Sequence, residues 1–305
     1  MAMGLKTKIS ALIILIFCFL DLNSGFSANI SIIDDTGQTV AIKSPAKRIV
    51  TLYGALTETV CALGFCNRLV GVTKRDNWPE ECRKKPKIGT HMRPNLELIV
   101  ALKPDLVLQG SVRPGSQLVV ERLKAIGIPV AIFNPTNFQE LFHEIKRIGI
   151  LCGDTKRADN LIKEMKKELS QLKNRYPLSK SPRVIYEISY PNFLVAGKKN
   201  FVSAIIYRAG GENIIKTPKK LVKIGIETIV SSSPDVYIVQ KGPMNKLLNK
   251  PCERPNFKTI GAVSQNRVLI VDEFTFSRPT PRSVEAVKIL RRYFFKYYPK
   301  IEDER

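Results

Sequence analysis

The sequence predicts a fold of class α/β, in which two lobes with central, mostly parallel sheets are joined by one long rigid helix. Short strand-like apolar segments alternate with helical segments in both halves, and a long amphipathic stretch lies between the halves. Such alternation is typical of parallel sheets that helices cover on both faces. We expect an N-terminal lobe over 28–150, a connecting helix within 151–178 and a C-terminal lobe over 179–305.

The two halves begin with the same order of elements. In the first half, strands are predicted over 48–52, 69–72, 106–108 and 128–132, and helices over 57–63 and 117–126. The second half begins with a strand predicted over 183–186 and a helix over 201–209. The shared order predicts two lobes of similar build.

One short pattern occurs in both halves. Glu97 begins a predicted helix, and the Pro-Asp pair at 104–105 opens an apolar strand seven residues later. Glu227 and the Pro-Asp pair at 234–235 repeat the arrangement at the same spacing. Pro-Asp favours turns and Glu favours a helix N-terminus, so shared turn chemistry and an internal repeat both remain open as explanations.

A single helix is predicted between the lobes. Asp154 supplies an N-cap and Pro177 a stop, so the helix should cover 154–176 with a lysine-rich outer face. Its apolar residues recur at intervals of three and four: Ala158, Leu161, Ile162, Met165, Leu169 and Leu172. A stiff helix limits the lobes to slight rocking, whereas a flexible Gly/Ser linker would predict wide closure.

The N-terminal segment 1–27 is typical of a secretory signal peptide. Lys6 and Lys8 precede an apolar run over 9–20, and small residues follow. The run is shorter than the roughly 20 residues that span a bilayer, which disfavours the alternative of an uncleaved anchor. Phe17 before Cys18 disfavours a lipoprotein. We therefore expect a periplasmic protein.

Composition excludes several functional classes. The formal charge of +22 is spread along the chain without a nucleic-acid-binding motif, so we expect a basic surface and no nucleic-acid partner. The only histidines, His91 and His143, are too few for a zinc receptor, and His143 should lie at the surface. Neither a nucleophile elbow nor an HExxH motif is present, although an exported hydrolase with a carboxylate pair stays open.

The cysteines give no metal-binding signature. Five follow the signal segment, without CxxC spacing: Cys61, Cys66, Cys82, Cys152 and Cys252. An odd number cannot pair completely within one chain. In an oxidising compartment one bridge is expected in the first lobe, between Cys66 and Cys82, with the other cysteines as buried free thiols.

A series of segments, taken in order, resembles the iron-siderophore and cobalamin periplasmic-binding family. The likeness runs from about 30 to 298 and rests on the segments 45–52, 57–58, 62–64, 68–73, 94–97, 102–107, 209–214, 234–236, 266–268 and 278–282. It implies a monomeric substrate-binding subunit of an ABC importer, with a permease and its ATPase as partners. It implies no enzyme activity, no catalytic residue, and no metal or cofactor apart from the captured solute.

The resemblance also implies a docking role for two glutamates. In that family a glutamate on each lobe docks onto arginines of the permease, and Glu97 and Glu227 occupy the matching positions. Charge complementarity of this kind sets orientation more than affinity. The simpler alternative is helix N-terminal stabilisation, worth about 0.3 to 1 kcal/mol. For Glu58, which is also expected to open a helix, the structural role is predicted.

Ligand-binding residues are expected in the loops that follow the strands, because ligands bind open α/β sheets at the carboxyl ends of their strands. These candidates are Tyr53, Arg75, Trp78, His91, Arg93, Arg113, Tyr190, Phe274 and Arg278, and the matching loops bind ligand in the family. Arg282 is predicted to hold the Arg278 loop in place. Guanidinium groups bind carboxylates and catecholates in pairs of hydrogen bonds, which favours a ferric siderophore or another anionic iron chelate. Cobalamin, haem and molybdate or tungstate remain alternatives.

Overall fold

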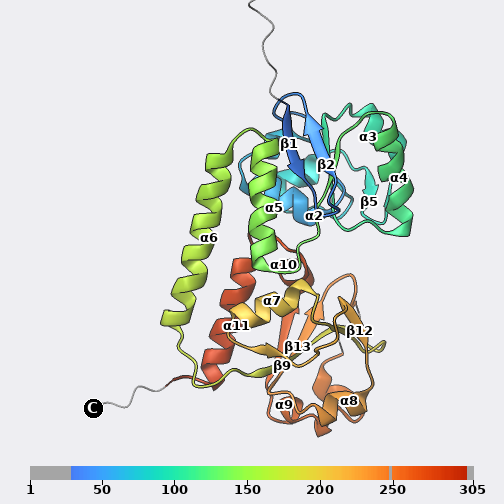
Figure 1. Ribbon diagram of the computed structural model, residues 1–305. Helices are drawn as coiled ribbons and strands as arrows, with labels where there is room; N and C mark the ends of the chain where they lie inside the picture. Colours follow the sequence, from blue (N-terminus) through green and yellow to red (C-terminus); the bar gives the residue numbers. More distant parts are fainter. Residues whose placement is uncertain (1–28, 247–248, 301–305) are drawn as a thin grey trace, which may run out of the picture.

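The computed structural model describes residues 29–246 and 249–300. The predicted signal peptide over 1–27 lies outside the described residues. Figure 1 shows two lobes, one above the other, with a long helix running beside both. The fold class predicted from the sequence is confirmed.

The N-terminal lobe is built on a four-stranded parallel sheet in the order β4-β3-β7-β8. Its strands are β3 (Ile49–Thr51), β4 (Leu69–Gly71), β7 (Leu106–Gln109) and β8 (Val130–Ile132). Helices α2 (Gly54–Ala62), α3 (Leu96–Ala101), α4 (Pro114–Ala125) and α5 (Phe138–Leu151) surround it. Two hairpins complete the lobe, β1 (Ile30–Ile33) with β2 (Thr39–Ile42) and β5 (Gly89–Thr90) with β6 (Arg93–Pro94).

Alternate side chains of this sheet enter two separate cores. Ile49 and Leu106 pack into one cluster of buried apolar residues, whereas Val50 and Val107 pack into another. Because successive strand residues point to opposite faces, this separation means that both faces of the sheet are covered.

The C-terminal lobe is built on a mixed six-stranded sheet in the order β12-β10-β9-β13-β14, with β11 also paired to β9. Its strands are β9 (Arg183–Ser189), β10 (Leu194–Ala196), β11 (Glu212–Asn213), β12 (Leu221–Lys223), β13 (Val236–Lys241) and β14 (Val268–Asp272). Strand β10 pairs antiparallel with both β12 and β9, and the other pairings are parallel. The helices are α7 (Phe201–Arg208), α8 (Ile226–Ser231), α9 (Gly261–Ser264), α10 (Glu273–Ser277) and α11 (Ser283–Tyr297).

The repeated sequence pattern corresponds to a repeated hydrogen-bond arrangement. Asp105, before β7, accepts the backbone N–H of Arg48 at 3.0 Å, and Asp235, before β13, accepts that of Arg183 at 2.8 Å. Each of these arginines also donates, at 2.6 Å, to the carbonyl oxygen that follows a short helix, α3 in one lobe and α8 in the other. Turn chemistry alone does not require these matching long-range bonds, so the arrangement supports an internal repeat.

The connecting helix α6 (Thr155–Arg175) is anchored to both lobes. Asp154 caps its first turn by accepting the N–H of Arg157 at 3.1 Å. Glycine at position 149 of α5 permits close packing, because a Cβ there would lie 2.6 Å from that of Ala158 in α6. At the other end, Arg291 of α11 donates to the carbonyl oxygen of the residue that follows α6, at 2.7 Å. Figure 1 shows α6 beside α5 in one lobe and α11 in the other.

A buried ion group joins the lobes a second time. Glu58 lies within α2, and its side chain is 3% exposed. It accepts hydrogen bonds from Arg278 at 3.0 Å and from Arg282 at 2.9 and 3.0 Å, both in the C-terminal lobe. The expectation that Glu58 opens a helix is wrong, because α2 begins at Gly54. The carboxylate is instead buried where the lobes meet, and two guanidinium groups from the other lobe compensate it.

The disulfide differs from the expected pairing of Cys66 with Cys82. Cys61 and Cys66 are joined, with their Cα atoms 4.2 Å apart. The chain reverses directly after α2, where the N–H of Phe65 bonds to the carbonyl oxygen of Val60 at 3.0 Å, and this turn brings Cys66 back beside Cys61. Among the other cysteines in the described part, Cys152 is a buried free thiol, as expected. Cys82 is a buried free thiol and not a bridge partner, and Cys252 is exposed, contrary to the expectation of a buried thiol.

Replacing Glu58 by glutamine should destabilise the protein strongly. The substitution leaves two guanidinium groups without a counter-charge, and Arg278 is 9% exposed. Loss of one partner from a buried ion pair typically costs about 3 to 5 kcal/mol in free energy of unfolding. Urea denaturation followed by circular dichroism measures this change.

The matched control is Glu285→Gln, which removes the same charge from an exposed pair with Lys288. Exposed pairs contribute about 0 to 1 kcal/mol, so the control should resemble the wild type. Equal stabilities of the two variants would mean that the Glu58 ion group does not hold the lobes together.

Candidate functional site

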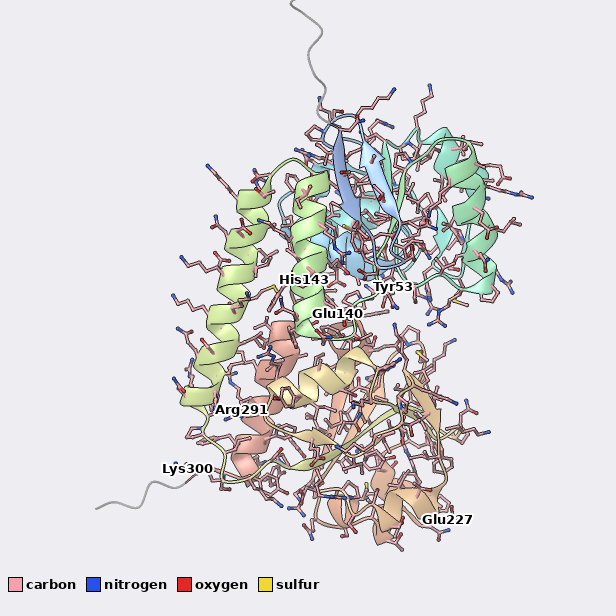
Figure 2. All side chains as sticks on the ribbon, viewed as in Figure 1. Tyr53, Glu140, His143, Glu227, Arg291 and Lys300 are labelled. Carbon is pink, nitrogen blue, oxygen red and sulfur yellow. A yellow bond between two sulfur atoms is a disulfide. The ribbon has the colours of Figure 1, made fainter. Side chains whose placement is uncertain are left out.

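A cavity of about 400 Å³ lies between the lobes. The N-terminal lobe contributes the segments after β3, β4, β7 and β8, and the C-terminal lobe contributes residues at or after the ends of β9, β13 and β14 and the start of α7. Carboxyl ends of parallel strands thus face the cavity from both sides, as expected for open α/β sheets. Figure 2 labels Tyr53 at this boundary between the lobes.

Basic side chains converge on the cavity. Arg75, His91 and Arg113 line it from the N-terminal lobe, and Lys220 and Arg278 line it from the C-terminal lobe. Burial lowers the pKa of His91, and the neighbouring Arg113, Arg278 and Arg75 lower it further. Burial and Arg113 likewise lower the pKa of Lys220. Because these groups disfavour one another's positive charge, an anionic ligand would relieve their repulsion.

Arg278 is positioned from three directions. Glu58 accepts its Nη1 hydrogen bond, and its guanidinium lies 4.2 Å from the centre of the Phe274 ring. Gly54 packs against it so closely that a Cβ at that position would lie 2.7 Å from the guanidinium carbon and 2.5 Å from a carboxylate oxygen of Asp76. The Arg278 side chain is therefore held in place before any ligand arrives, which reduces the entropy lost on binding.

Aromatic rings form the less polar part of the wall. Tyr53, Phe133, Phe201 and Phe274 line the cavity together with the cationic groups. The rings of Tyr53 and His91 lie with their centres 6.0 Å apart. Burial raises the pKa of Tyr53, so its phenol is protonated at neutral pH. The wall therefore offers apolar contact area beside positive charge.

The structure brings together six of the nine ligand-binding candidates and leaves three outside the cavity lining. The six are Tyr53, Arg75, His91, Arg113, Phe274 and Arg278. Trp78 is 53% exposed, and Arg282 lies over its ring at 5.1 Å. Arg93 is exposed in β6. Tyr190 packs against the guanidinium of Arg254 at 4.0 Å, in a cluster inside the C-terminal lobe.

Sequence reasoning missed several polar residues that line the cavity. Gln109 ends β7 and Gln240 lies near the end of β13, and each is 1% exposed. Within the described residues, Oε1 of Gln109 and Nε2 of Gln240 have no hydrogen-bond partner. Lys220 extends from the C-terminal lobe and donates to Oδ1 of Asn134 in the N-terminal lobe at 2.5 Å. The two glutamines could have been found as polar residues at the ends of apolar strands.

Glu144 of α5 is a buried carboxyl in the cavity wall. Its side chain is buried, with the residue 1% exposed. In the described part of the chain its carboxyl group accepts a single, long hydrogen bond, donated by the Thr59 hydroxyl at 3.4 Å. Burial, with a contribution from Asp35, raises its pKa to about 8. The group is therefore mostly neutral at pH 7 and adds little negative charge to a cationic cavity.

The two candidate docking glutamates lie outside the cavity. Glu97 is exposed in the first turn of α3, where Asn95 caps the helix by accepting the N–H of Leu98 at 2.8 Å. Glu227 is exposed in the first turn of α8. Figure 2 labels Glu227 at the outer end of the C-terminal lobe, and Figure 1 shows α3 at the outer side of the other lobe. In the described part of the chain, neither carboxylate forms an ion pair.

Two further findings concern the surface and the membrane. His143 is exposed on α5, as predicted, and Figure 2 places it on that helix. Across 29–246 and 249–300, no helix has both the length and the apolar character that a membrane span requires.

Comparison with known proteins gives a consistent set of matches. A family profile described as periplasmic binding protein matches residues 49–274. An uncharacterized ABC transporter substrate-binding lipoprotein of Bacillus subtilis, YvrC, is 34% identical over 267 residues, which cover 86% of this chain and 84% of that protein. A vitamin B12-binding protein of Vibrio parahaemolyticus is 24% identical, with 80% of this chain and 87% of that one covered.

A solved structure has the same fold. The periplasmic heme-binding protein RhuT from Roseiflexus sp. RS-1 superimposes with a TM-score of 0.73 at 24% sequence identity, covering 82% of this chain and 98% of that one.

The Glu144 carboxyl should make stability depend on pH. The folded protein keeps this proton up to about pH 8, whereas the unfolded chain loses it near the ordinary pKa of 4.5. Between these values the folded state binds more protons, so the free energy of unfolding should decrease as pH rises, by up to roughly 1.4 kcal/mol per pH unit. Glu144→Gln should remove this contribution, as urea denaturation at a series of pH values would measure.

Glu164→Gln, at an exposed position of α6, is the control and should keep the wild-type pH dependence. A Glu144→Gln variant whose stability varies with pH as steeply as that of the wild type would contradict the assignment of a neutral buried carboxyl.

Proposed function

This chain belongs to the periplasmic binding protein family, and from that membership we propose that its inter-lobe cavity captures an anionic metal chelate for an ABC importer. It is an extracytoplasmic ABC transporter substrate-binding protein, and proteins of this kind deliver solutes to a permease with its ATPase and are not enzymes.

The convergence of cationic groups carries the choice of ligand. Arg75, Arg113 and Arg278 reach one cavity from both lobes, close enough to His91 to lower its pKa. Guanidinium groups bind carboxylate and catecholate oxygens through pairs of charge-assisted hydrogen bonds. A ferric siderophore with negative charge supplies such oxygens on its surface. This class of ligand is our first candidate.

Haem is the second candidate, and a specific arrangement favours it. Tyr53 and His91 line the cavity with their rings 6.0 Å apart, and both side-chain types bind haem iron in proteins. The carboxylates of haem would pair with the same arginines. Cobalamin, which the name of one relative gives as its ligand, has less negative charge to match this cavity.

A ligand screen tests the proposal. An anionic iron chelate should raise the melting temperature in proportion to the logarithm of its concentration over Kd. The probes are a ferric catecholate siderophore, ferric citrate, haem, cobalamin and molybdate, and the measurement is thermal-shift fluorimetry. Stabilisation by cobalamin alone would contradict the proposed preference for an anionic ligand. If no probe shifted the melting temperature, the proposal that the ligand is a metal chelate would be contradicted.

Arg113→Ala should weaken binding of the stabilising chelate. Loss of a charge-assisted hydrogen bond costs about 1.5 to 3 kcal/mol, which corresponds to a roughly 10- to 100-fold higher Kd in a calorimetric titration. Arg93→Ala is the matched control, because Arg93 is an exposed arginine outside the cavity lining. If both variants bind as tightly as the wild type, Arg113 does not contact the ligand.

The docking role of Glu97 and Glu227 is a separate proposal. Both carboxylates are exposed on repeat-related short helices, and each helix is followed by the same arginine-to-carbonyl bond. Two equivalent acidic groups, one on each lobe, suit a membrane partner with two similar halves. The helices place these charges away from the ligand cavity.

Replacing Glu97 and Glu227 together by alanine should separate transport from binding. Uptake of the bound chelate by cells with the cognate permease should fall at least about tenfold, because orientation on the permease is lost, while Kd stays unchanged. A control double variant, Glu121→Ala with Glu285→Ala, removes exposed acidic residues from α4 and α11 and should transport normally. A parallel loss of ligand affinity in the first variant would contradict the docking role.

A further inference from the structure

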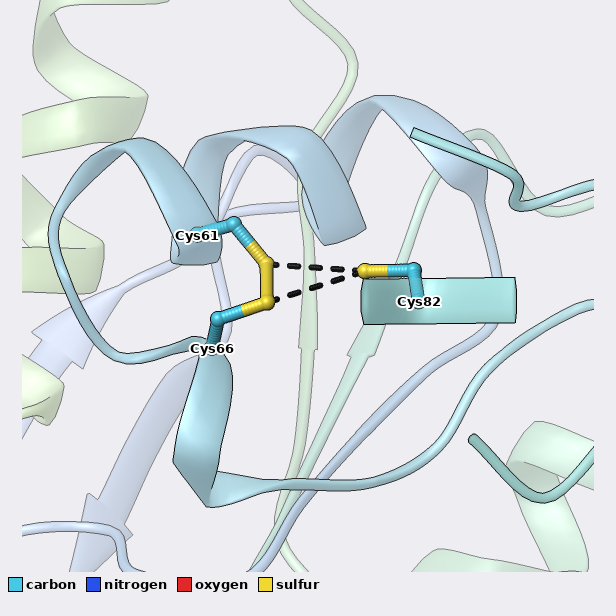
Figure 3. A group of neighbouring side chains, drawn as sticks. All are labelled: Cys61, Cys66 and Cys82. Carbon is cyan, nitrogen blue, oxygen red and sulfur yellow. Dashed lines mark hydrogen bonds between the residues drawn. A yellow bond between two sulfur atoms is a disulfide. The ribbon is translucent and has the colours of Figure 1, made fainter. Parts of the chain in front are cut away.

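A compact group of three cysteines lies apart from the ligand cavity. The disulfide of Cys61 and Cys66 faces the thiol of Cys82, whose Sγ is 3.6 Å from each of the other two sulfur atoms. Figure 3 shows the three side chains converging from different segments of the N-terminal lobe. None of them lines the inter-lobe cavity, so the solute site gives no role to this sulfur cluster.

The fold holds the backbone of Cys82 in place independently of the disulfide. Cys82 lies in the short 3₁₀ helix Glu80–Lys84, and its N–H bonds to the carbonyl oxygen of Pro79 at 2.9 Å. The ammonium group of Lys87 donates to the carbonyl oxygens of Cys82 and Asp76 at 2.8 and 3.0 Å. These bonds to the backbone would remain if the disulfide were opened.

The position of Cys82 argues against a simple exchange of disulfide partners. A thiolate attacks a disulfide along the extension of the sulfur–sulfur bond. Equal distances to Cys61 and Cys66 place the Cys82 sulfur beside the middle of that bond instead. This placement suits three sulfur atoms that surround a common centre.

We propose that reduction of the disulfide converts this sulfur cluster into a three-thiolate site for one soft cation of the Cu⁺ class. A dithiol reductant would give two electrons and two protons to Cys61 and Cys66 and become a disulfide itself. Each of the three cysteines then loses its thiol proton to water and forms a metal–sulfur bond to the incoming cation. No change in the oxidation state of the metal is needed.

The ligand set favours Cu⁺ over Zn²⁺. Thiolates are soft ligands, and the three sulfur atoms lie within 4.8 Å of one another. In the described part of the chain, no histidine or carboxylate joins this group as a fourth ligand. Structural Zn²⁺ sites almost always have four protein ligands, whereas Cu⁺ accepts three sulfur ligands.

Burial would protect such a site and leave one route to it. Cys66 and Cys82 are buried, and Cys61 is partly exposed at the end of α2. A cation would therefore enter past Cys61. The disulfide form offers a single thiol, so the site would exist only in the reduced protein.

Anaerobic titration with Cu⁺ tests the proposal. Full-length protein is reduced with dithiothreitol, freed of reductant, and titrated against a chromophoric Cu⁺ chelator, with native mass spectrometry to count bound ions. We expect one Cu⁺ per reduced chain, with sulfur-to-metal charge-transfer absorption, and no such binding by the oxidised chain. Equal binding by the oxidised chain would overturn the proposal, and preferential binding of Zn²⁺ in a parallel titration would overturn the choice of metal.

Variants identify the ligands. Cys82→Ser should weaken Cu⁺ binding at least about tenfold, because one of three metal–sulfur bonds is lost. Cys252→Ser is the control, since Cys252 is an exposed free thiol, and it should bind as the wild type does. Loss of binding in the control, with retention in Cys82→Ser, would place the ion elsewhere. Should Cys82→Ser not fold, as judged by circular dichroism, Cys61→Ser tests a second ligand with the same expected loss.

Discussion

The structure depends on one buried carboxylate. Glu58 belongs to the N-terminal lobe, and both of its guanidinium partners, Arg278 and Arg282, belong to the C-terminal lobe. Glu58 and Arg278 are almost fully removed from water, whereas the side chain of Arg282 is 29% exposed. Loss of the ion group would therefore leave at least one buried charge without compensation. Arg278 also forms part of the cavity wall, so the same interaction sets the spacing of the lobes and presents positive charge to the ligand.

The connecting helix α6 is a second attachment between the two lobes. Helix α6 packs on α5 at one end and is bound by Arg291 of α11 at the other, so it fixes the lobes along one side of the molecule. The ion group fixes them again where α2 meets α10 and α11. Two separate attachments resist rotation better than a helix alone. A cavity between lobes held in this way has its size set before the ligand binds, which favours recognition of a rigid solute.

Local sequence patterns were sufficient to predict elements whose determinants are close in the chain. The periodicity over 154–176 and its cap at Asp154 predicted α6 nearly to its ends, and the repeated Pro-Asp pattern predicted equivalent strands in the two lobes. The direction in which a side chain points was harder to predict from the sequence. Trp78 and Tyr190 follow strands, as the cavity residues do, but Trp78 points into solvent beside Arg282 and Tyr190 packs on Arg254.

Long-range pairing could not be read from the sequence. Glu58 and Arg278 are separated by 220 positions, and no local pattern connects them. The bridge between Cys61 and Cys66 depends on the turn after α2, which Cys spacing alone does not reveal. Glu144 and Lys220 become cavity residues only because the lobes meet as they do.

The central claim is that the lobes are held at a fixed separation around a preformed cavity. Small-angle X-ray scattering of the ligand-free protein, and of the protein saturated with the chelate that stabilises it most, measures this directly. We expect superimposable distance distributions under this claim, because the Glu58 ion group and α6 are already in place. A clear contraction of the radius of gyration on binding would show closure of open lobes and would contradict it.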